Sequence, residues 1–212
     1  MKIQLNRIWL LCCLAGTIIA TGCQKDYLSG GSLHVANTPL NNIDYMKSNQ
    51  LHLFDTTVAI IQKMGLTDEV NNAKTFFAFT DYSLNLYMVA KATAKQLVNP
   101  SAVYTIDSLA KDITADSIRQ YMFSQTIELA TAQTTITPYT SLGNTPMGVM
   151  KILQTAAPYT TNSQAPTYLL YFGRIKGGTN DIATLCQTEG IKTSNGNTTL
   201  HVLANTHTFA RF

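Results

Sequence analysis

TFFAFTDYS, residues 75 to 83, is the stretch that decides the fold of this chain. Its first half is a compact apolar run, which is typical of a buried strand, and Phe76, Phe77 and Phe79 are expected in the core. Thr80 and Asp81 follow, and side chains of both types accept hydrogen bonds from the free N–H groups at a helix start. The helical pattern YSLNLYMVAKATAKQL comes next. The stretch therefore predicts a buried strand that leads directly into a capped helix.

A helix is also predicted before this strand. In LFDTTVAIIQKMG, Phe54, Val58 and Ile61 recur at helical spacing, so we expect a helix from about Leu53 to Met64. Gly65 follows it and is suited to the left-handed conformation that ends many helices.

The pattern changes along the rest of the chain. Residues 98 to 113 predict an irregular segment, and Thr114 is expected to cap a helix over ADSIRQYMF that runs into the strand-like QTIELA. Beyond Thr131, short apolar runs alternate with turns, and they predict strands: PMGVMKIL, PTYLLYFGRI, IATLCQT and TTLHVLA. Helices in the first half and strands in the second favour an α+β domain.

A second stretch, NGNTTLHVLANTHTF at residues 195 to 209, closes the domain. Asn195-Gly196 suits a turn that requires positive φ. His201 lies on the strand that follows, where its ring is expected to hydrogen-bond within the core rather than bind a ligand.

Together, the two stretches resemble the two signatures of the fasciclin-like domain family, and the resemblance covers residues 42–212. It implies a wedge of mixed β-strands with helices packed in the N-terminal half, and a non-enzymatic role in adhesion or in protein or glycan binding. The family resemblance also implies that the strand after Asn195-Gly196 and the first stretch meet in one sheet, with Phe77 and Val202 in one core.

Phe79 stands where the family usually has proline, and Asn197 to Thr199 lengthens the second turn. Phe123-Ser124 replaces a Tyr-His pair that is tied to receptor contacts in some animal members, so animal-type adhesion is not carried over.

The N-terminal region predicts export and lipidation. Lys2 and Arg7 precede the uncharged apolar run Ile8 to Ala20, which is too short for the ~20 residues that span a bilayer as a helix. The small residues before Cys23 resemble a bacterial lipobox, which implies acylation of the Cys23 thiol and attachment to a membrane surface. An ordinary secretory signal is the alternative. We assign residues 1–22 to a signal peptide, 23–41 to a lipidated tether and 42–212 to the fasciclin-like domain.

Gln24, Lys25 and Asp26 indicate a location. They resemble the short export signals that send lipoproteins of glycan-foraging Gram-negative bacteria to the exterior of the outer membrane; the alternative is a solvated tether. Such lipoproteins accompany outer-membrane nutrient importers. The expected partners are therefore the membrane through the lipid anchor, an outer-membrane transporter complex, or a glycan.

Composition and motifs limit the kinds of ligand and reaction that are expected for this chain. Without Lys2 and Arg7, the chain has 13 basic against 12 acidic residues, so nothing favours nucleic acid. The four histidines do not join cysteine or paired carboxylates at metal-ligand spacing, so neither a metal nor a cofactor is expected. Cys186, outside the leader and anchor, is expected to be a buried thiol. No Gly-x-Ser-x-Gly elbow is present. The prediction is a non-enzymatic binding module; the alternative is a surface hydrolase acting on extracellular polymers.

Candidate binding residues are exposed aromatics on loops. Tyr139, Tyr159 and Tyr168 are candidates for stacking on a sugar, within or near the segments Pro138 to Asn144 and Pro158 to Pro166, and the alternative is that they cover the sheet. Three Asp-Ser/Thr-apolar triplets resemble acceptors for O-glycosylation, and each is equally suited to start a helix: residues 55–57, 107–109 and 116–118.

Overall fold

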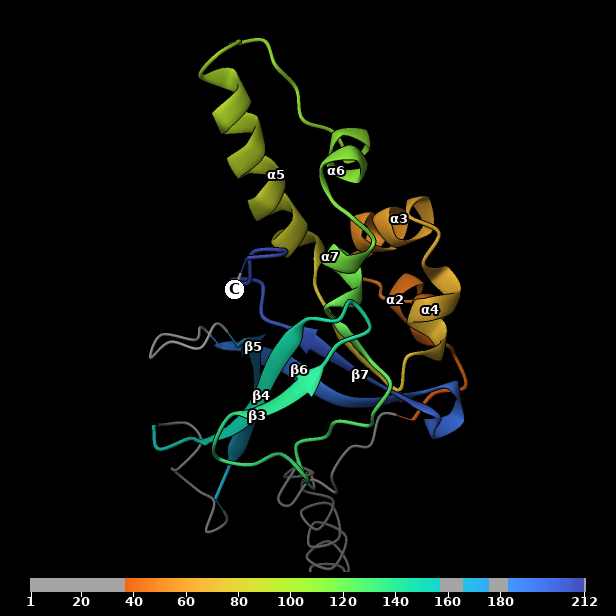
Figure 1. Cartoon of the computed structure of the whole chain (residues 1–212). Coiled ribbons are helices and arrows are strands. Elements are labelled where there is room, and N and C mark those ends of the chain that lie inside the picture. The colour runs from red at the N-terminus through yellow and green to blue at the C-terminus, as the bar shows by residue number, and fades with distance from the viewer. Residues whose placement is uncertain (1–36, 157–165, 176–182, 212) are drawn as a thin grey trace, which may run out of the picture. The chain divides into compact units, whose positions relative to one another are not determined.

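A computed structural model of the chain describes residues 37–156, 166–175 and 183–211. The described α-helices all lie before residue 120: α2 Asn42–Lys47, α3 Asp55–Lys63, α4 Thr67–Asn72, α5 Asp81–Gln96, α6 Ile106–Asp112 and α7 Asp116–Arg119. A single 3-10 turn, η1 Ser194–Gly196, follows near the end of the domain. The strands lie mostly in the second half: β1 Thr75–Ala78, β2 Met122–Phe123, β3 Thr137–Thr140, β4 Pro146–Leu153, β5 Tyr168–Arg174, β6 Ala183–Thr193 and β7 Thr198–Leu203. The expected α+β class is confirmed, with the α-helices preceding most of the strands along the chain (Figure 1).

The strands form one mixed sheet in the order β2-β1-β7-β6-β5-β4-β3. Strands β1 and β7 are parallel neighbours, and every other pair is antiparallel. Phe77 lies opposite His201, and Ala78 lies opposite Val202. The two stretches that were expected to meet are therefore adjacent, although more than a hundred residues separate them in sequence.

The sheet nearly closes on itself. The Leu142 N–H, just after β3, donates to the carbonyl of Met122 in β2 at 2.9 Å, so the two edge strands come together. The ring of Phe123 meets that of Tyr139 edge-on, with 6.3 Å between centroids. The hydrogen bond and the ring contact thus bring the two edges of the sheet together.

Aromatic side chains fill the space that the sheet encloses. Phe77 is fully buried, stacks on Phe172 with 4.2 Å between ring centroids, and contacts the His201 ring at 4.9 Å. Successive residues of a strand point to opposite faces. Phe76 accordingly lies on the other face of β1, where it is also fully buried. Burial of Phe76, Phe77 and Phe79 is confirmed.

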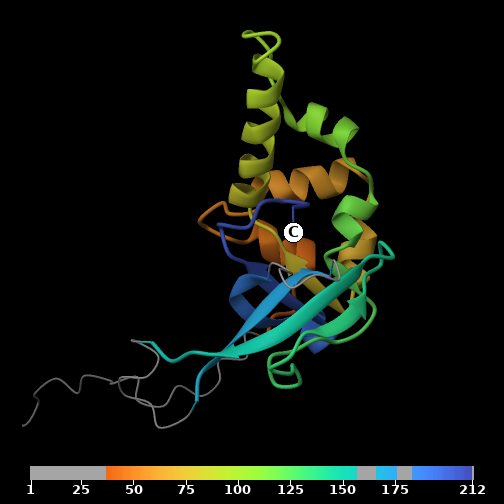
Figure 2. The same cartoon turned by 60° about the vertical axis from the view of Figure 1, so that its left-hand side comes forward.

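Helix α5 projects away from the sheet (Figures 1 and 2). Its first turns are anchored by Ser83, Leu84 and Tyr87, which are buried, whereas its last turn is exposed on all sides. Helix α6 runs beside it on the return. None of the helices in the described ranges is long and apolar enough to cross a bilayer.

Three expectations for residues 98 to 130 are wrong. The segment expected to be irregular contains α6, which begins with a capping box between Thr105 and Ser108. The helix expected over ADSIRQYMF ends at Arg119, and its last two residues form β2 instead, because they pair with β1 and are fully buried there. QTIELA forms no strand, although the Ile127 N–H donates to the Thr75 hydroxyl at 2.9 Å.

Two further details concern the ends of the domain. Residues 37 to 41, expected in the tether, contact the sheet, since the Thr38 N–H donates to the Lys192 carbonyl at 2.8 Å. Asn195 and Gly196 have positive φ, at 57° and 89°, as expected for the second turn.

All three Asp-Ser/Thr-apolar triplets lie at helix starts, those of α3, α6 and α7.

Candidate functional site

A solvent-open cleft of about 290 Å³ lies between the starts of α3 and α5, and we name it the α3–α5 cleft. Its walls come from the loop before α3 and from the first turns of both helices: Leu51, His52, Leu53, Thr56, Asp81, Tyr82 and Asn85. None of the tyrosines expected to bind is among these residues.

The Asp81 carboxylate fixes the floor of the cleft. One oxygen accepts from the Thr56 N–H at 2.9 Å, and the other accepts from the Thr57 N–H at 2.8 Å and its hydroxyl at 3.0 Å. These N–H groups lie in the first turn of α3, where a helix leaves backbone donors without partners. Phe54, at the N-cap position of α3, supplies no side-chain cap. Asp81 therefore caps α3 from another helix and holds the two helix starts together.

Thr80 and Asp81 are predicted to cap the helix that follows them, and this prediction is wrong. Asp81 caps α3 instead of α5. Thr80 occupies the N-cap position of α5 but makes no side-chain cap there. Its buried hydroxyl instead donates to the side-chain oxygen of Asn205 at 3.0 Å, beyond the end of β7. Tertiary contacts have redirected both polar side chains from local to long-range partners.

His52 and Asp55 form a dyad at the rim. The His52 Nδ1 lies 2.9 Å from a carboxylate oxygen of Asp55, and the two side chains are 78% and 61% exposed. His52 has a φ of 53°, a left-handed conformation that is uncommon for residues other than glycine. The dyad leaves Nε2 available to a ligand, because this atom hydrogen-bonds to no residue in the described ranges.

Tyr82 and Asn85 line the α5 side of the cleft with polar groups that are open to a ligand. Tyr82 is 55% exposed, Asn85 is exposed, and neither side chain hydrogen-bonds to any part of the chain that the structure describes. An aromatic face beside an amide and an imidazole suits a ligand with both apolar faces and hydroxyl groups. The cleft thus offers a stacking surface and polar groups within one small region.

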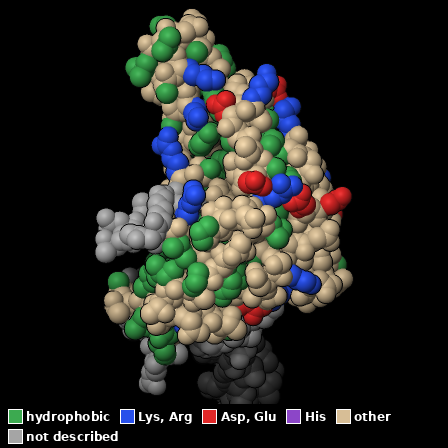
Figure 3. All heavy atoms as spheres, in the orientation of Figure 1, with side chains coloured by type: hydrophobic (Ala, Val, Ile, Leu, Met, Phe, Trp, Pro, Cys, Tyr) green, Lys and Arg blue, Asp and Glu red, His purple; other side chains and the backbone are tan. Residues whose placement is uncertain are grey.

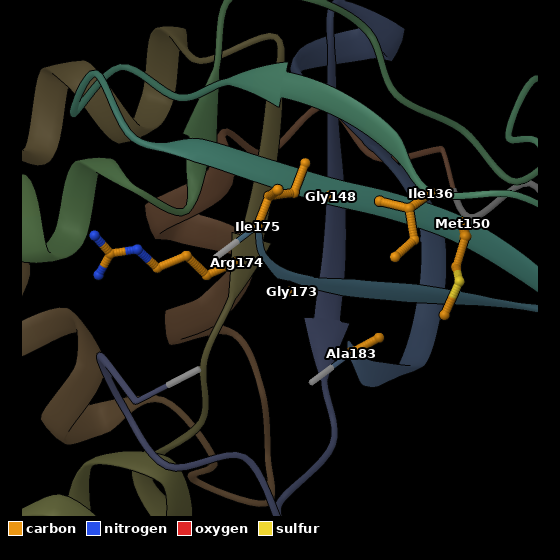
Figure 4. Close-up of a pocket in the computed structure, with 7 residues that line it drawn as sticks. All are labelled: Ile136, Gly148, Met150, Gly173, Arg174, Ile175 and Ala183. Atoms are coloured by element: carbon orange, nitrogen blue, oxygen red, sulfur yellow. The ribbon is translucent and has the colours of Figure 1, made fainter. Parts of the chain in front are cut away.

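Two other hollows are less suited to a ligand. Figure 4 shows the pocket around Gly148 and Ile136, where about 10 Å³ is accessible, roughly the space of one water molecule. A Cβ on Gly148 would lie 2.7 Å from a methyl of Ile136, so aliphatic packing already fills this region. A wider, mostly apolar hollow of about 330 Å³ includes Glu69, whose carboxylate is held by Arg119 at 2.6 and 2.7 Å. That pairing lowers the pKa of Glu69.

The two predicted sugar-binding tyrosines that the structure describes, Tyr139 and Tyr168, already contact other side chains. Tyr139 lies in β3 rather than in a loop, is half-buried and packs against Phe123, so it covers the sheet. Tyr168 begins β5, and the Lys151 ammonium lies 5.3 Å from its ring centroid, so a cation already occupies one ring face. Tyr159 and the predicted lipidation site Cys23 lie outside the described residues.

The buried titratable groups serve the fold. His201 accepts from the Gly190 N–H at 3.2 Å through Nδ1 and donates to the Ile127 carbonyl at 2.9 Å through Nε2, which fixes a neutral tautomer. Burial lowers its pKa to about 4, and the expected core role is confirmed. Cys186 is buried, and burial raises its pKa, so the thiol is unreactive. Among the described residues, no group of His, Cys, Asp and Glu side chains could hold a metal ion.

No model of a known protein family matches the chain, and no curated protein matches it. A function must therefore be inferred from the residues of the chain and their arrangement.

Proposed function

We propose that the chain is a non-enzymatic, surface-anchored binding module and that its α3–α5 cleft binds carbohydrate. A lipid on Cys23 holds it at the outer membrane, facing the exterior, in keeping with the lipobox-like sequence and with Gln24-Lys25-Asp26. An outer-membrane nutrient importer is the transporter partner that this location favours. The bound glycan is then a polymer fragment captured at the cell surface.

The observation that carries this proposal is Tyr82, which stands exposed at the cleft beside the unpartnered amide of Asn85. The apolar face of a sugar ring stacks on an aromatic ring, and its hydroxyls pair with amides, imidazoles and carboxylates. Asp81 holds the cleft in place without a ligand, because it is the first residue of α5 and its carboxylate bonds to the start of α3. Such preorganisation reduces the entropy lost on binding.

We further propose that the fold is the fasciclin-like wedge. The parallel pairing of β1 with β7 supports this, because it brings the two signature-like stretches together. The burial of Phe77 and His201 in that pair is also in keeping with structural roles for both stretches. The Thr80–Asn205 hydrogen bond adds a second connection between them.

A surface hydrolase is the second candidate, and the His52–Asp55 dyad is the observation that favours it. A carboxylate that orients a histidine is the arrangement of many general bases. Both side chains are mostly exposed, however, and hydrolytic sites hold their base in a shielded position where electrostatic effects are strong. The dyad therefore supports hydrogen bonding to a ligand better than catalysis.

The test is a screen of the full chain on an array of bacterial and plant polysaccharide fragments, followed by calorimetry with the fragment that binds best. Tyr82→Ala and Asn85→Ala should each weaken binding about tenfold or more, with melting temperatures unchanged, because both side chains are exposed. Tyr168→Ala, which removes a tyrosine outside the cleft, is the matched control. Equal loss with Tyr168→Ala, or full retention with Tyr82→Ala, would reject the cleft.

The same fragments decide between binding and hydrolysis. Chromatography of the fragments after incubation should show no cleavage. Cleavage that disappears in His52→Gln would replace the binding module with a hydrolase.

A further inference from the structure

The projecting end of α5 and the turn after it form the most exposed apolar surface in the described ranges. Leu97, Val98 and Val103 are 85%, 89% and 76% exposed, and we call these three residues the apolar tip. Figure 3 shows hydrophobic side chains gathered at the end of the projection. Large apolar side chains exposed together in this way mark an interaction site.

The charges around the tip are of one sign. From Tyr82 to Ile106 the sequence contains Lys91 and Lys95 but no aspartate or glutamate. The Lys95 ammonium lies over the ring of Tyr104, 4.9 Å from its centroid, and makes no ion pair among the described residues. Lys91 lies 3.7 Å from Asp112 at the base of the projection. An apolar end with lysine behind it complements a surface with an apolar interior and anionic groups outside.

The shape of the tip also indicates what kind of surface it contacts. Leu97 is the C-cap residue of α5, and Val98 and Val103 lie in the turn and loop beyond it, so the tip lies at the narrow end of the projection rather than on a flat face (Figures 1 and 2). Three such side chains offer a few hundred Å², well below the ~800 Å² per partner of a stable protein interface. A lipid layer requires no matching shape, because acyl chains close around whatever enters.

We propose that the apolar tip inserts into the interfacial region of a lipid bilayer, with Lys95 at the level of the headgroups. Burial of three large aliphatic side chains provides the affinity, and the lysine stem can extend toward phosphate while its own methylenes remain apolar. The contact is distinct from the α3–α5 cleft. The insertion depends on the proposed lipid anchor only because the anchor keeps the domain near the bilayer. A tethered domain meets the bilayer at high effective concentration.

The proposal predicts a local contact with acyl chains at residue 98. Val98→Trp is placed in the full chain with Trp9→Phe, so that one indole reports, and is mixed with phosphatidylethanolamine–phosphatidylglycerol vesicles that carry brominated acyl chains. Bromine quenches only an indole that reaches the acyl region. We expect its emission to fall about twofold or more, as for an interfacially inserted side chain. Leu153→Trp in the same background, at the exposed end of β4, is the control and should keep its emission.

Three further measurements identify which groups of the tip cause the quenching. Leu97→Ser/Val103→Ser, added to the reporter, should remove the quenching by removing apolar area. Lys95→Gln, and likewise a neutral phosphatidylcholine vesicle, should weaken it. An unquenched Val98→Trp indole on protein that floats with the vesicles would overturn the insertion while leaving the anchor intact. Equal quenching of both indoles would overturn it as well, and self-association abolished by the serine variant would assign the tip to a second copy.

Discussion

Asp81 accepts hydrogen bonds from both the backbone N–H and the hydroxyl of Thr57, at 2.8 and 3.0 Å, and thereby joins the start of α5 to the start of α3. Thr57 is fully buried, so its donors cannot turn to water if the carboxylate is lost. The Asp81 side chain therefore helps to fix the two helix starts that line the α3–α5 cleft, together with the hydrogen bond that the Asp81 N–H donates to the Leu53 carbonyl at 2.9 Å.

Asp81→Ala should destabilise the domain by about 1–3 kcal/mol, because it removes a helix cap and leaves the buried Thr57 N–H without an acceptor. The Thr57 hydroxyl keeps a second acceptor, the Phe79 carbonyl at 3.2 Å. Urea unfolding followed by circular dichroism measures this loss. Asp107→Ala is the matched control, since Asp107 is also a first-turn aspartate but is exposed and pairs only with Lys63 at the surface. An Asp81→Ala midpoint as high as that of the control would show that the cap contributes nothing.

Phe77→Ala should cost about 3–5 kcal/mol, as expected when a large side chain is removed from a packed core. Phe77 contacts Phe172 and His201, so the cavity would form where the sheet closes. Thermal and urea unfolding measure the loss, and Leu51→Ala, which removes a side chain that is 76% exposed, should change neither. An unchanged melting temperature in Phe77→Ala would contradict the proposed packing of β1 against β5 and β7.

Gly196→Ala should destabilise the domain by about 1 kcal/mol, because φ is 89° there and a Cβ is disfavoured at positive φ. An added Cβ would have no atom within 4 Å, so the cost comes from the backbone alone. Asn195→Gly, at the neighbouring φ of 57°, is the control and should leave stability unchanged or raise it. Equal stability of wild type and Gly196→Ala in urea would refute the strain argument.

Stability should fall as pH is lowered from 6.5 to 4. Burial lowers the pKa of His201 and of His207 from the ordinary 6.5 to about 4, so in this window the unfolded chain binds protons that the folded chain does not. Each ring should therefore subtract about 1.4 kcal/mol per pH unit. Glu189 acts in the opposite direction, because burial raises its pKa above 4.5 and its protonation favours the folded state.

A variant isolates the contribution of one ring. His201→Gln retains an amide that can donate toward the Ile127 carbonyl but does not titrate. It should lower stability at pH 7.5 and flatten the pH dependence between 6.5 and 4 by about 1.4 kcal/mol per unit. Urea midpoints across this range measure the slope. A variant as steep as the wild type would mean that His201 is not the neutral, buried ring described above.

Cys23→Ala should abolish labelling of the chain by a fatty-acid probe and release a soluble or uncleaved protein, because the thiol is the proposed acylation site. The matched control is Cys186→Ala, which removes a thiol buried within the domain. Fractionation of cells that express each variant gives the distribution between membrane and soluble protein. Labelling that persists in Cys23→Ala would exclude acylation at this residue.

Strong local patterns were sufficient for much of the fold. The compact apolar run around Phe77 predicted a buried strand, and the spacing of Phe54, Val58 and Ile61 predicted α3, because side-chain periodicity follows directly from backbone geometry. Asn195-Gly196 predicted a turn with positive φ for the same kind of reason. These elements depend mainly on neighbours a few residues away.

The partners of polar and aromatic side chains depended on tertiary structure. Thr80 and Asp81 carry the chemistry of helix caps, but only packing decided that Thr80 would bond to Asn205 and Asp81 to α3. Tyr139 and Tyr82 are equally aromatic in sequence, yet one packs against Phe123 and the other remains exposed at the cleft. Hydrogen bonding and burial are set by whichever group the fold brings within reach, and the chain on either side of a residue does not contain that information.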